Sequence, residues 1–345
     1  MLALAAASAS AYHLPIARHV AISRASTPVA QINSDSRVTQ EYFDFLLGRN
    51  QREVTEDGPS IIVGGGKIGT MLEDFGKRRG FEDLIVNRGD PIPADWFGPV
   101  YVCVPIDDVE SVLAACPPEK KDDLVFVQDG MLEPLFQRHG LYGPTQATLW
   151  LACMRKGGKP VDGLTSEAPE GLTTVSGKWA GAVAMRLSTG DLTCKESMDR
   201  DARRVMLEKL VFCSAYNLVG TVHGHSKDDP LTVGEVAEKH SEEVGAISRE
   251  LASFIRYTLS VSLFSGIEER LQAYAQRMEF MKCKSISKDF EFFNGYFYKF
   301  AKMAGTRVTP AGIKVEVPDT TPIHTDYVKW CHEKGYVNQA LLDSV

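Results

Sequence analysis

One helical stretch places three side chains capable of chemistry on a single face. Lys209, Cys213 and Asn217 recur every four residues, so an α-helix over residues 206–217 would bring them to one side. Because three large apolar residues follow Lys209 directly, its ammonium is expected to be partly buried. Burial would lower its pKa and suit it to act as an acid. The spacing alone favours a lysine that extends to solvent, because most helical lysines are surface residues.

A glycine-rich turn follows a short apolar run. Residues 60–63 read Ser-Ile-Ile-Val, typical of a buried parallel strand, and lead into a G-x-G-x-x-G pattern that opens a helical stretch. Gly64 would permit the tight turn, Gly66 the approach of a pyrophosphate, and Gly69 close packing of helix and strand. The turn therefore predicts a dinucleotide site rather than a ligand-free loop. The phosphates would be held at the start of the helix, by Lys67 and Ile68.

The end of the second expected strand indicates which dinucleotide is bound. NAD sites place an Asp or Glu there for the ribose 2′-hydroxyl, whereas this chain has Asn87 and Arg88. A guanidinium is a planar, permanently charged donor that suits a 2′-phosphate, and an asparagine can hydrogen-bond the ribose. The cofactor expected is NADP(H). The alternative for Arg88 is a solvated surface arginine.

The order of apolar runs predicts an α/β fold, with an N-terminal Rossmann doubly wound parallel sheet followed by an all-α C-terminal domain. Strands are expected at 60–63, 84–86, 99–104, 124–127, 173–175 and 182–185. Helices are expected at 108–115, 199–219, 233–264, 267–281 and 287–304. We divide the chain into a leader at 1–38, an NADP-binding domain at 58–194, a helical substrate domain at 195–320 and a C-terminal tail at 321–345. Residues 310–325 read as a loop, and one more helix is expected before Val345.

Composition limits the classes of function. The chain has 345 residues and a net charge of −7, which argues against a nucleic-acid partner because such proteins show a basic face. Apolar runs are shorter than a membrane span. Seven widely spaced cysteines predict buried thiols rather than disulfides or a zinc site. His223 and His225 are interpreted as surface groups without a supporting carboxylate, so no metal is expected.

The first 38 residues have the composition of a targeting segment. They are rich in Ala and Ser, contain Arg18 and Arg24, and carry no acid before Asp35. We expect an organellar protein, with a plastid favoured over a mitochondrion. If the segment is instead an untargeted Ala-rich terminus, the protein would be cytoplasmic.

From about Ser60 to Gly305 the chain resembles ketopantoate reductase (2-dehydropantoate 2-reductase), a member of the 6-phosphogluconate-dehydrogenase-like superfamily. The resemblance lies in the order of several short motifs: the glycine turn, Arg88, Gln128-Asp129-Gly130, Lys209-Leu210 with Asn217, Glu242-Glu243-Val244, and Phe293-Asn294-Gly295. It implies that Lys209 protonates or polarises a ketone oxygen while NADPH delivers hydride. It also implies that Asn217 orients the substrate, and that Asp289, in the place of a family glutamate, holds Lys209. Gln128 would belong to the cofactor site.

Several positions depart from the family pattern. Cys213 replaces an asparagine that bonds substrate, Asp129 replaces the asparagine of Gln-Asn-Gly, and Pro105 replaces a lysine after a strand. The serine that grips the substrate falls on Arg277. An arginine there would bind a carboxylate or phosphate, or fill the pocket. The chemistry is expected to be retained in outline, with substrate recognition altered.

Three functions remain in competition. The first is an NADPH-dependent reductase of a small 2-oxo acid such as 2-dehydropantoate. The second is a reductase of a different carbonyl compound held by Arg277. The third is a non-catalytic NADPH-binding regulatory protein, since a fold does not guarantee chemistry. The expected partner is a small carbonyl substrate, without nucleic acid or membrane, and both a monomer and a homodimer are compatible with the sequence.

Overall fold

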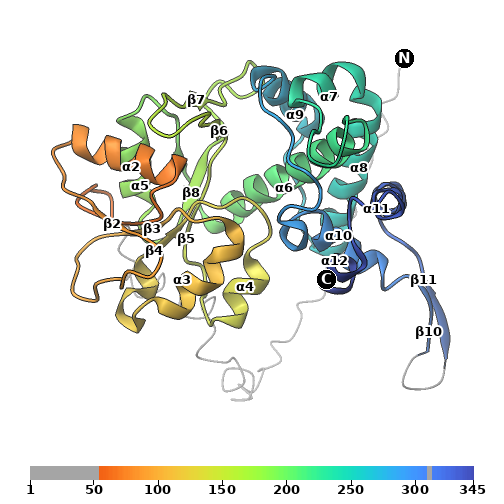
Figure 1. The fold of residues 1–345 in the computed structure, drawn as a ribbon, viewed down its shortest axis with the longest axis horizontal. Coiled ribbons are helices and arrows are strands. Elements are labelled where there is room, and N and C mark those ends of the chain that lie inside the picture. Colours follow the sequence, from red (N-terminus) through yellow and green to blue (C-terminus); the bar gives the residue numbers. More distant parts are fainter. Residues whose placement is uncertain (1–53, 309–312) are drawn as a thin grey trace, which may run out of the picture. The chain divides into compact units, whose positions relative to one another are not determined.

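The computed structural model describes residues 54–308 and 313–345. A seven-stranded sheet comes first, in the order β2-β1-β3-β4-β5-β8-β9 (Figure 1). Its first five strands are parallel, β8 is antiparallel to β5, and β9 is parallel to β8. The strands are β1 (Ile61–Val63), β2 (Leu84–Val86), β3 (Val100–Val102), β4 (Leu124–Phe126), β5 (Thr145–Thr148), β8 (Thr174–Ser176) and β9 (Lys195–Glu196).

Helices cover both faces of this sheet, because alternate strand residues point to opposite sides. Ile61 and Val63 pack with α3 (Val109–Ala115) and α4 (Glu133–Arg138). Ile62, between them, packs with α2 (Lys67–Arg78) and α5 (Ala180–Ser188) on the other face. The chain leaves β1 toward β2 and returns to β3 on the opposite side of β1. In sheets of this kind, ligands bind beside such a switch point, at the carboxyl ends of the strands.

The remaining chain is helical and has its own core. The long helix α6 (Asp199–Val222) lies at its centre and contacts both α7 (Val233–Lys239) and α8 (Ser241–Thr258). Then follow α9 (Ile267–Arg277), η4 (Phe290–Phe292), α10 (Asn294–Ala301), α11 (Pro322–Glu333) and α12 (Gln339–Asp343). Two short hairpins accompany these elements: β6 (Leu151–Ala152) with β7 (Val161–Asp162), and β10 (Gly305–Val308) with β11 (Lys314–Val317).

Five sequence expectations are wrong in detail. Residues 182–185 lie in helix α5, because the spacing of Ala182, Val183 and Leu187 buries one helical face against the sheet. The helix expected at 233–264 breaks at His240, and the one expected at 287–304 begins only at Asn294. Residues 310–325 include β11 and the start of α11. The segment 321–345 is no loose tail, because Val328 and Cys331 are fully buried in the helical core. The leader at 1–38 lies outside the described residues.

A buried arginine forms a hydrogen-bond network with the residues next to the first strands of the sheet. Arg186 on α5 is fully buried, and its guanidinium bonds the carboxylates of Asp57 (2.8 Å) and Asp83 (2.7 Å) and the carbonyls of Gly58 and Leu72. Asp83 also accepts from the backbone and hydroxyl of Ser60. Because a buried charge must be paired and hydrogen-bonded, this network sets the approach to β1 against α2 and α5.

One helix of the described residues, α6, is long and apolar enough to cross a membrane by length and composition. In this structure 78 % of its apolar window is buried inside the protein. Its apolar residues therefore form the centre of the helical core.

A second charged cluster supports the sheet beside β4. Asp123, the last residue of η3 (Pro118–Asp123), accepts hydrogen bonds from Lys120 (2.5 Å), Lys178 (2.6 Å) and the indole of Trp179 (3.1 Å). Burial alone would raise the pKa of the Asp123 carboxyl, but the bonds from the two lysines lower it below its usual value. The contribution of Asp123 to stability is therefore present above the unfolded-chain pKa, near 3.8, and is lost as pH falls through the folded pKa.

Replacing this carboxylate should lower stability at neutral pH and matter less in acid. We expect Asp123→Asn to lose on the order of 2 kcal/mol of unfolding free energy at pH 7, as for hydrogen bonds to charged groups. The loss should shrink at pH 3, below the unfolded-chain pKa of 3.8, because the contribution of this carboxylate to stability is lost as pH falls toward its lower folded pKa. Urea unfolding at the two pH values measures this difference. Asp122→Asn, at the exposed neighbouring position, is the matched control. An equal loss at both pH values would contradict the assignment.

Candidate active site

The glycine turn has the backbone that a pyrophosphate cradle requires. Gly64 has a φ of +100°, and a Cβ there would lie 2.9 Å from the carbonyl oxygen of Cys103. A Cβ at Gly69 would overlap the carbonyl oxygen of Gly64, so both positions need glycine. Gly66, at the start of α2, is exposed, and the nearest atom to a Cβ there would be 3.9 Å away. The space beside Gly66, at the start of α2, is therefore open to the approach of a pyrophosphate.

Cations surround this turn. Lys67 is exposed at the first position of α2. The ammonium of Lys156, a residue that the sequence analysis missed, lies 3.9 Å from where a Cβ of Gly65 would be. Arg88 follows β2 with Asn87, is 85 % exposed, and pairs with Asp108 at 2.6 Å. Such exposed ion pairs are weak, so a phosphate can compete for the guanidinium.

Gln128 is built into the edge of the sheet. Its side-chain amide donates to the carbonyl oxygens of Val102 (2.7 Å) and Val104 (2.9 Å), at the end of β3. Its own Oε1 is buried and has no partner among the described residues. Gln128 therefore fixes the strand end beside the turn and leaves one acceptor available there.

Lys209 lies at the same edge of the sheet, although it belongs to α6. Its side chain is 8 % exposed. The ammonium pairs with Asp129 at 3.0 Å, bonds the backbone carbonyl of Leu149, and lies 5.4 Å from the ring centre of Trp150. Leu149 follows β5 directly, and Asp129 lies three residues after the end of β4. Because parallel strands end at one edge, the acceptors for Lys209 and the glycine turn after β1 lie along the same edge.

The next two turns of α6 bring Cys213 and Asn217 toward the same cluster. Burial raises the pKa of the Cys213 thiol to about 12, with the nearby charge of Asp129 adding to it. The group is therefore a neutral thiol and a weak hydrogen-bond donor. The amide oxygen of Asn217 accepts from the backbone N–H of Lys284 at 2.9 Å. That bond fixes the amide and leaves its NH₂ group as a donor.

A second lysine, which the sequence analysis missed, completes the cluster. Lys284 lies beside Asp289, with its ammonium 3.4 Å from the carboxylate. Burial works to lower the pKa of Lys284, but the charges of Asp129 and Asp289 raise it above the usual value. Burial, followed by the charge of Asp289, also raises the pKa of Asp107 on η2 (Ile106–Asp108). The loop of residues 278–293 supplies Lys284, a position that no spacing argument singled out.

Asp289 is therefore not the partner of Lys209. It has a left-handed backbone conformation (φ 56°) just before η4 and pairs with Lys284, whereas Asp129 pairs with Lys209. The expectation failed because spacing along the chain placed a carboxylate on a continuous helix that the structure does not contain. Asp129 lies after a strand of the sheet, far from Lys209 in sequence, so the sequence alone does not reveal the contact.

Arg277 lies elsewhere in the helical half. It is the last residue of α9, is exposed, and donates to the backbone carbonyl of Asp162 on β7 at 3.4 Å. Lys284, and not Arg277, is the second cation near Asp129 and Cys213, beside Lys209. Pro105 precedes η2 and begins the turn that follows β3.

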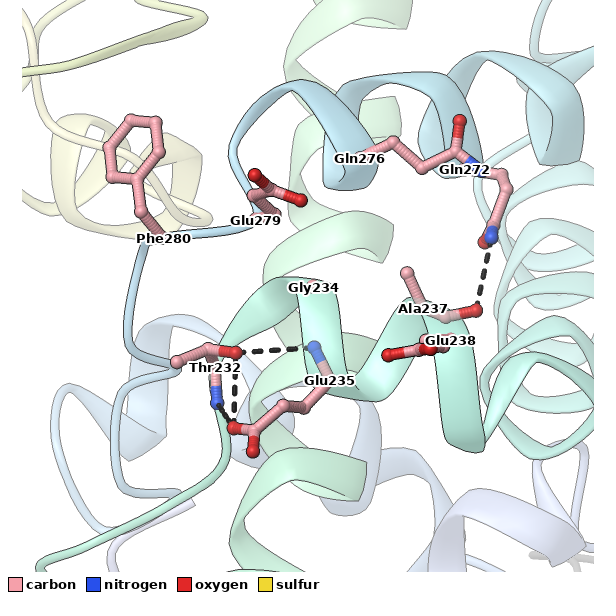
Figure 2. A pocket seen from close by; sticks show the side chains of 9 residues that line it. All are labelled: Thr232, Gly234, Glu235, Ala237, Glu238, Gln272, Gln276, Glu279 and Phe280. Carbon is pink, nitrogen blue, oxygen red and sulfur yellow. Dashed lines mark hydrogen bonds between the residues drawn. The ribbon is translucent and has the colours of Figure 1, made fainter.

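A cavity of about 550 Å³ lies between α7 and α9 (Figure 2). Its wall includes Glu235, Glu238 and Glu279 and none of the predicted site residues. Thr232 and Glu235 form a capping box that starts α7, with the Glu235 carboxylate accepting from the Thr232 backbone at 2.8 Å. This bond, followed by the one from the Thr232 hydroxyl, lowers the pKa of Glu235. The role of the Glu235 carboxylate is therefore structural, because it caps the start of α7.

Solved structures show which fold this is. A probable 2-dehydropantoate 2-reductase from Bacillus subtilis is 15 % identical and superposes with a TM-score of 0.50, covering 79 % of this chain and 99 % of that one. A D-mandelate dehydrogenase, in a ternary structure with NADH and anilino(oxo)acetate, is 12 % identical with a TM-score of 0.52, covering 83 % and 99 %. No family model and no curated protein matches the chain. The α/β fold expected from the resemblance, with a Rossmann-type sheet and a helical C-terminal half, is confirmed.

The pairing of Lys209 can be tested by double-mutant cycles with Lys209→Met, Asp129→Asn and Asp289→Asn. We expect a coupling energy on the order of 1–3 kcal/mol between positions 209 and 129, because removing one partner leaves the other charge buried and unpaired. Positions 209 and 289 should be additive to within about 0.5 kcal/mol. Urea unfolding of the single and double variants gives both values. A larger coupling to position 289 would reverse the assignment.

Proposed function

We propose that this protein is an NADPH-dependent oxidoreductase that reduces the carbonyl group of a small molecule. The observation that carries the proposal is the position of Lys209. Its buried ammonium is held at the sheet edge where the glycine turn also lies. The solved structures of the same fold include a dehydrogenase bound to NADH, and a ligand crevice at this edge is the rule for such sheets.

The residues present fit a phosphorylated dinucleotide. The open space at Gly66 and the first N–H groups of α2 suit a pyrophosphate, and the first turn of that helix carries no acid. Lys67 and Lys156 add positive charge, and Arg88 offers a fork for a 2′-phosphate. Asn87 and Gln128 supply further polar groups at the strand ends. When bound, NADPH supplies the hydride.

Lys209 is suited to bond the carbonyl oxygen of a substrate. An ammonium has three N–H donors, and one of them is directed to the Leu149 carbonyl, while the Asp129 carboxylate lies 3.0 Å away as an ion-pair partner. Another N–H group can bond an oxygen on which negative charge develops, and transfer its proton there. The ion pair with the Asp129 carboxylate fixes the direction of the Lys209 side chain. Asn217, immobilised by Lys284, offers its NH₂ group to a second substrate oxygen.

The first candidate substrate is a 2-oxo acid such as 2-dehydropantoate. Lys284 supports this choice, because its side chain is 54 % exposed beside the Lys209 cluster and its ammonium can attract a carboxylate. It replaces Arg277 as the candidate anion-binding group.

The charge of the site favours a second candidate, a carbonyl compound without a carboxylate. Three carboxylates, of Asp107, Asp129 and Asp289, surround the ammonium groups of Lys209 and Lys284. An anionic substrate would therefore enter a site that already has its cations paired. A neutral carbonyl compound would avoid that repulsion.

NADPH oxidation, followed by absorbance, tests the function with 2-dehydropantoate and its uncharged lactone as substrates. We expect turnover with at least one of them, and a loss of about 10²-fold or more in Lys209→Ala, because a proton donor contributes that much. Lys227→Ala, at an exposed loop lysine, should keep full activity. The ratio of the NADPH oxidation rates with the two compounds decides between a charged and a neutral substrate class.

Two outcomes would contradict this proposal. Full turnover in Lys209→Ala would remove the proton-donor role. NADPH binding without reduction of either compound would favour the non-catalytic regulatory protein.

Cofactor choice is tested separately by binding. Arg88→Ala should weaken NADPH binding by roughly 10- to 100-fold, the equivalent of about 1.5–3 kcal/mol for charge-assisted hydrogen bonds. NADH binding should change little, because NADH lacks the 2′-phosphate. Fluorescence titration of both cofactors measures the change, with Arg78→Ala on the exposed side of α2 as the control. Equal weakening of both cofactors would contradict a role in 2′-phosphate recognition.

A further inference from the structure

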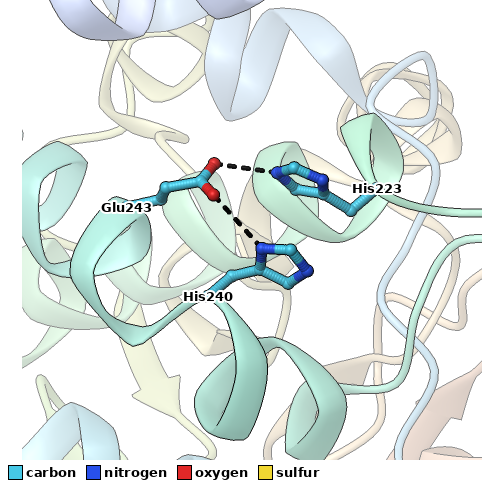
Figure 3. A group of neighbouring side chains, drawn as sticks. All are labelled: His223, His240 and Glu243. Atoms are coloured by element: carbon cyan, nitrogen blue, oxygen red, sulfur yellow. Dashed lines mark hydrogen bonds and ion pairs between the residues drawn. The ribbon is translucent and has the colours of Figure 1, made fainter.

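Two histidines and a glutamate from separate segments meet at one end of α6. His223 follows the last residue of α6, His240 separates α7 from α8, and Glu243 lies in the first turn of α8. Their ligand-type atoms all lie within 4.8 Å of one another (Figure 3). The cluster is outside the proposed active site, and the proposed reaction does not use it.

We propose that His223, His240 and Glu243 form a binding site for a divalent transition-metal ion of the zinc type, which ties α6 to α8. The chemical basis is the ligand set. Two imidazoles and one carboxylate are ligands that Zn²⁺ prefers, and three protein ligands with a solvent molecule complete a tetrahedron. The sequence analysis had dismissed His223 for lack of a supporting carboxylate. Glu243 supplies it from 20 residues away.

The geometry needs little adjustment to accept an ion. The Nε2 atom of His223 lies 2.8 Å from one carboxylate oxygen of Glu243, and the Nδ1 atom of His240 lies 3.2 Å from the other. Ligands at about 2.0–2.2 Å from a tetrahedral zinc are about 3.3–3.6 Å apart. A small shift of the carboxylate away from each histidine would therefore bring these two separations into that range. The two rings are stacked 3.8 Å apart, so both nitrogen atoms face the same carboxylate.

The surroundings prepare the carboxylate and leave the site open to solvent. Tyr327 on α11 donates a hydrogen bond to Glu243 at 2.5 Å, which orients the carboxylate as outer-shell partners do in metal sites. Partial burial alone would raise the pKa of Glu243, but the bonds from Tyr327, His223 and His240 lower it to about 2. The three ligand side chains are 19–35 % exposed, so an ion can reach them.

An ion at this position would connect three helices of the core. His223 ends α6, Glu243 begins α8, and Tyr327 adds α11 through its hydrogen bond. α6 is the helix that also carries Lys209. The role inferred for the metal is therefore structural, fixing the far end of the helix that carries the proposed proton donor.

Zinc competition with a chromogenic chelator tests the site on the full chain after removal of bound metal. We expect one equivalent of Zn²⁺ to be withheld from the chelator by the wild type. His240→Ala and His223→Ala should each weaken binding by more than the roughly 10- to 100-fold that loss of an outer-shell partner costs. His139→Ala is the matched control, because His139 pairs with one carboxylate, Glu110, at 3.1 Å but has no second histidine in that pair.

Two further measurements separate loss of the site from loss of the fold. Zn²⁺ should raise the Tm of the wild type and of His139→Ala in a concentration-dependent manner, and leave the Tm of folded His240→Ala unchanged. Co²⁺ should give the visible absorption of a tetrahedral complex only when all three ligands are present. If wild type and both site variants compete equally for Zn²⁺, the cluster is a hydrogen-bonded group without metal and the proposal is wrong. These measurements follow metal binding and not turnover, so their outcome does not depend on whether the protein oxidises NADPH.

Discussion

A buried ammonium must be surrounded by acceptors, and this requirement determines how α6 docks on the sheet. Lys209 occupies the apolar face of a core helix, where an unpaired charge would cost several kcal/mol. The carboxyl edge of the parallel strands provides what it needs, in the carboxylate of Asp129 after β4 and the carbonyl of Leu149 after β5. Arg203, at the start of the same helix, adds a bidentate pair with Glu133 on α4. The polar contacts that place α6 therefore also place the group proposed to act on substrate.

The parts of the fold that the sequence predicted are those with local causes. Strand β1, the turn with Gly64 and Gly69, and helix α2 follow from an apolar run, a positive φ and a helical period within one short segment. Helix α5 was mistaken for a strand because a short apolar run fits both structures, and only its packing on α2 and the sheet distinguishes them. α11 was taken for a tail because the burial of Val328 and Cys331 depends on helices α6 and α8, which are distant in sequence.

The same distinction applies to the site. Lys209 and the glycine turn were identified because resemblance and spacing within one element point to them. The partner of Lys209 was not identified, because Asp129 belongs to another element and no sequence spacing relates it to position 209. Lys284, in the loop before η4, and Glu243, on α8, were missed for a related reason. Each becomes part of a cluster only when separate helices pack together. The role of the leader stays a prediction.

The network around Arg186 limits how far the chain can be shortened from its N-terminus. Asp57 precedes the first strand, yet its carboxylate neutralises a guanidinium at the centre of the sheet layer. Val54, slightly earlier, exchanges backbone hydrogen bonds with Lys178 and Ala182. A protease that trims the chain upstream of Val54 leaves all these bonds intact. One that cuts a few residues later leaves Arg186 with Asp83 as its remaining carboxylate partner in this network. A shortened chain that keeps these bonds must therefore begin at Val54 or earlier.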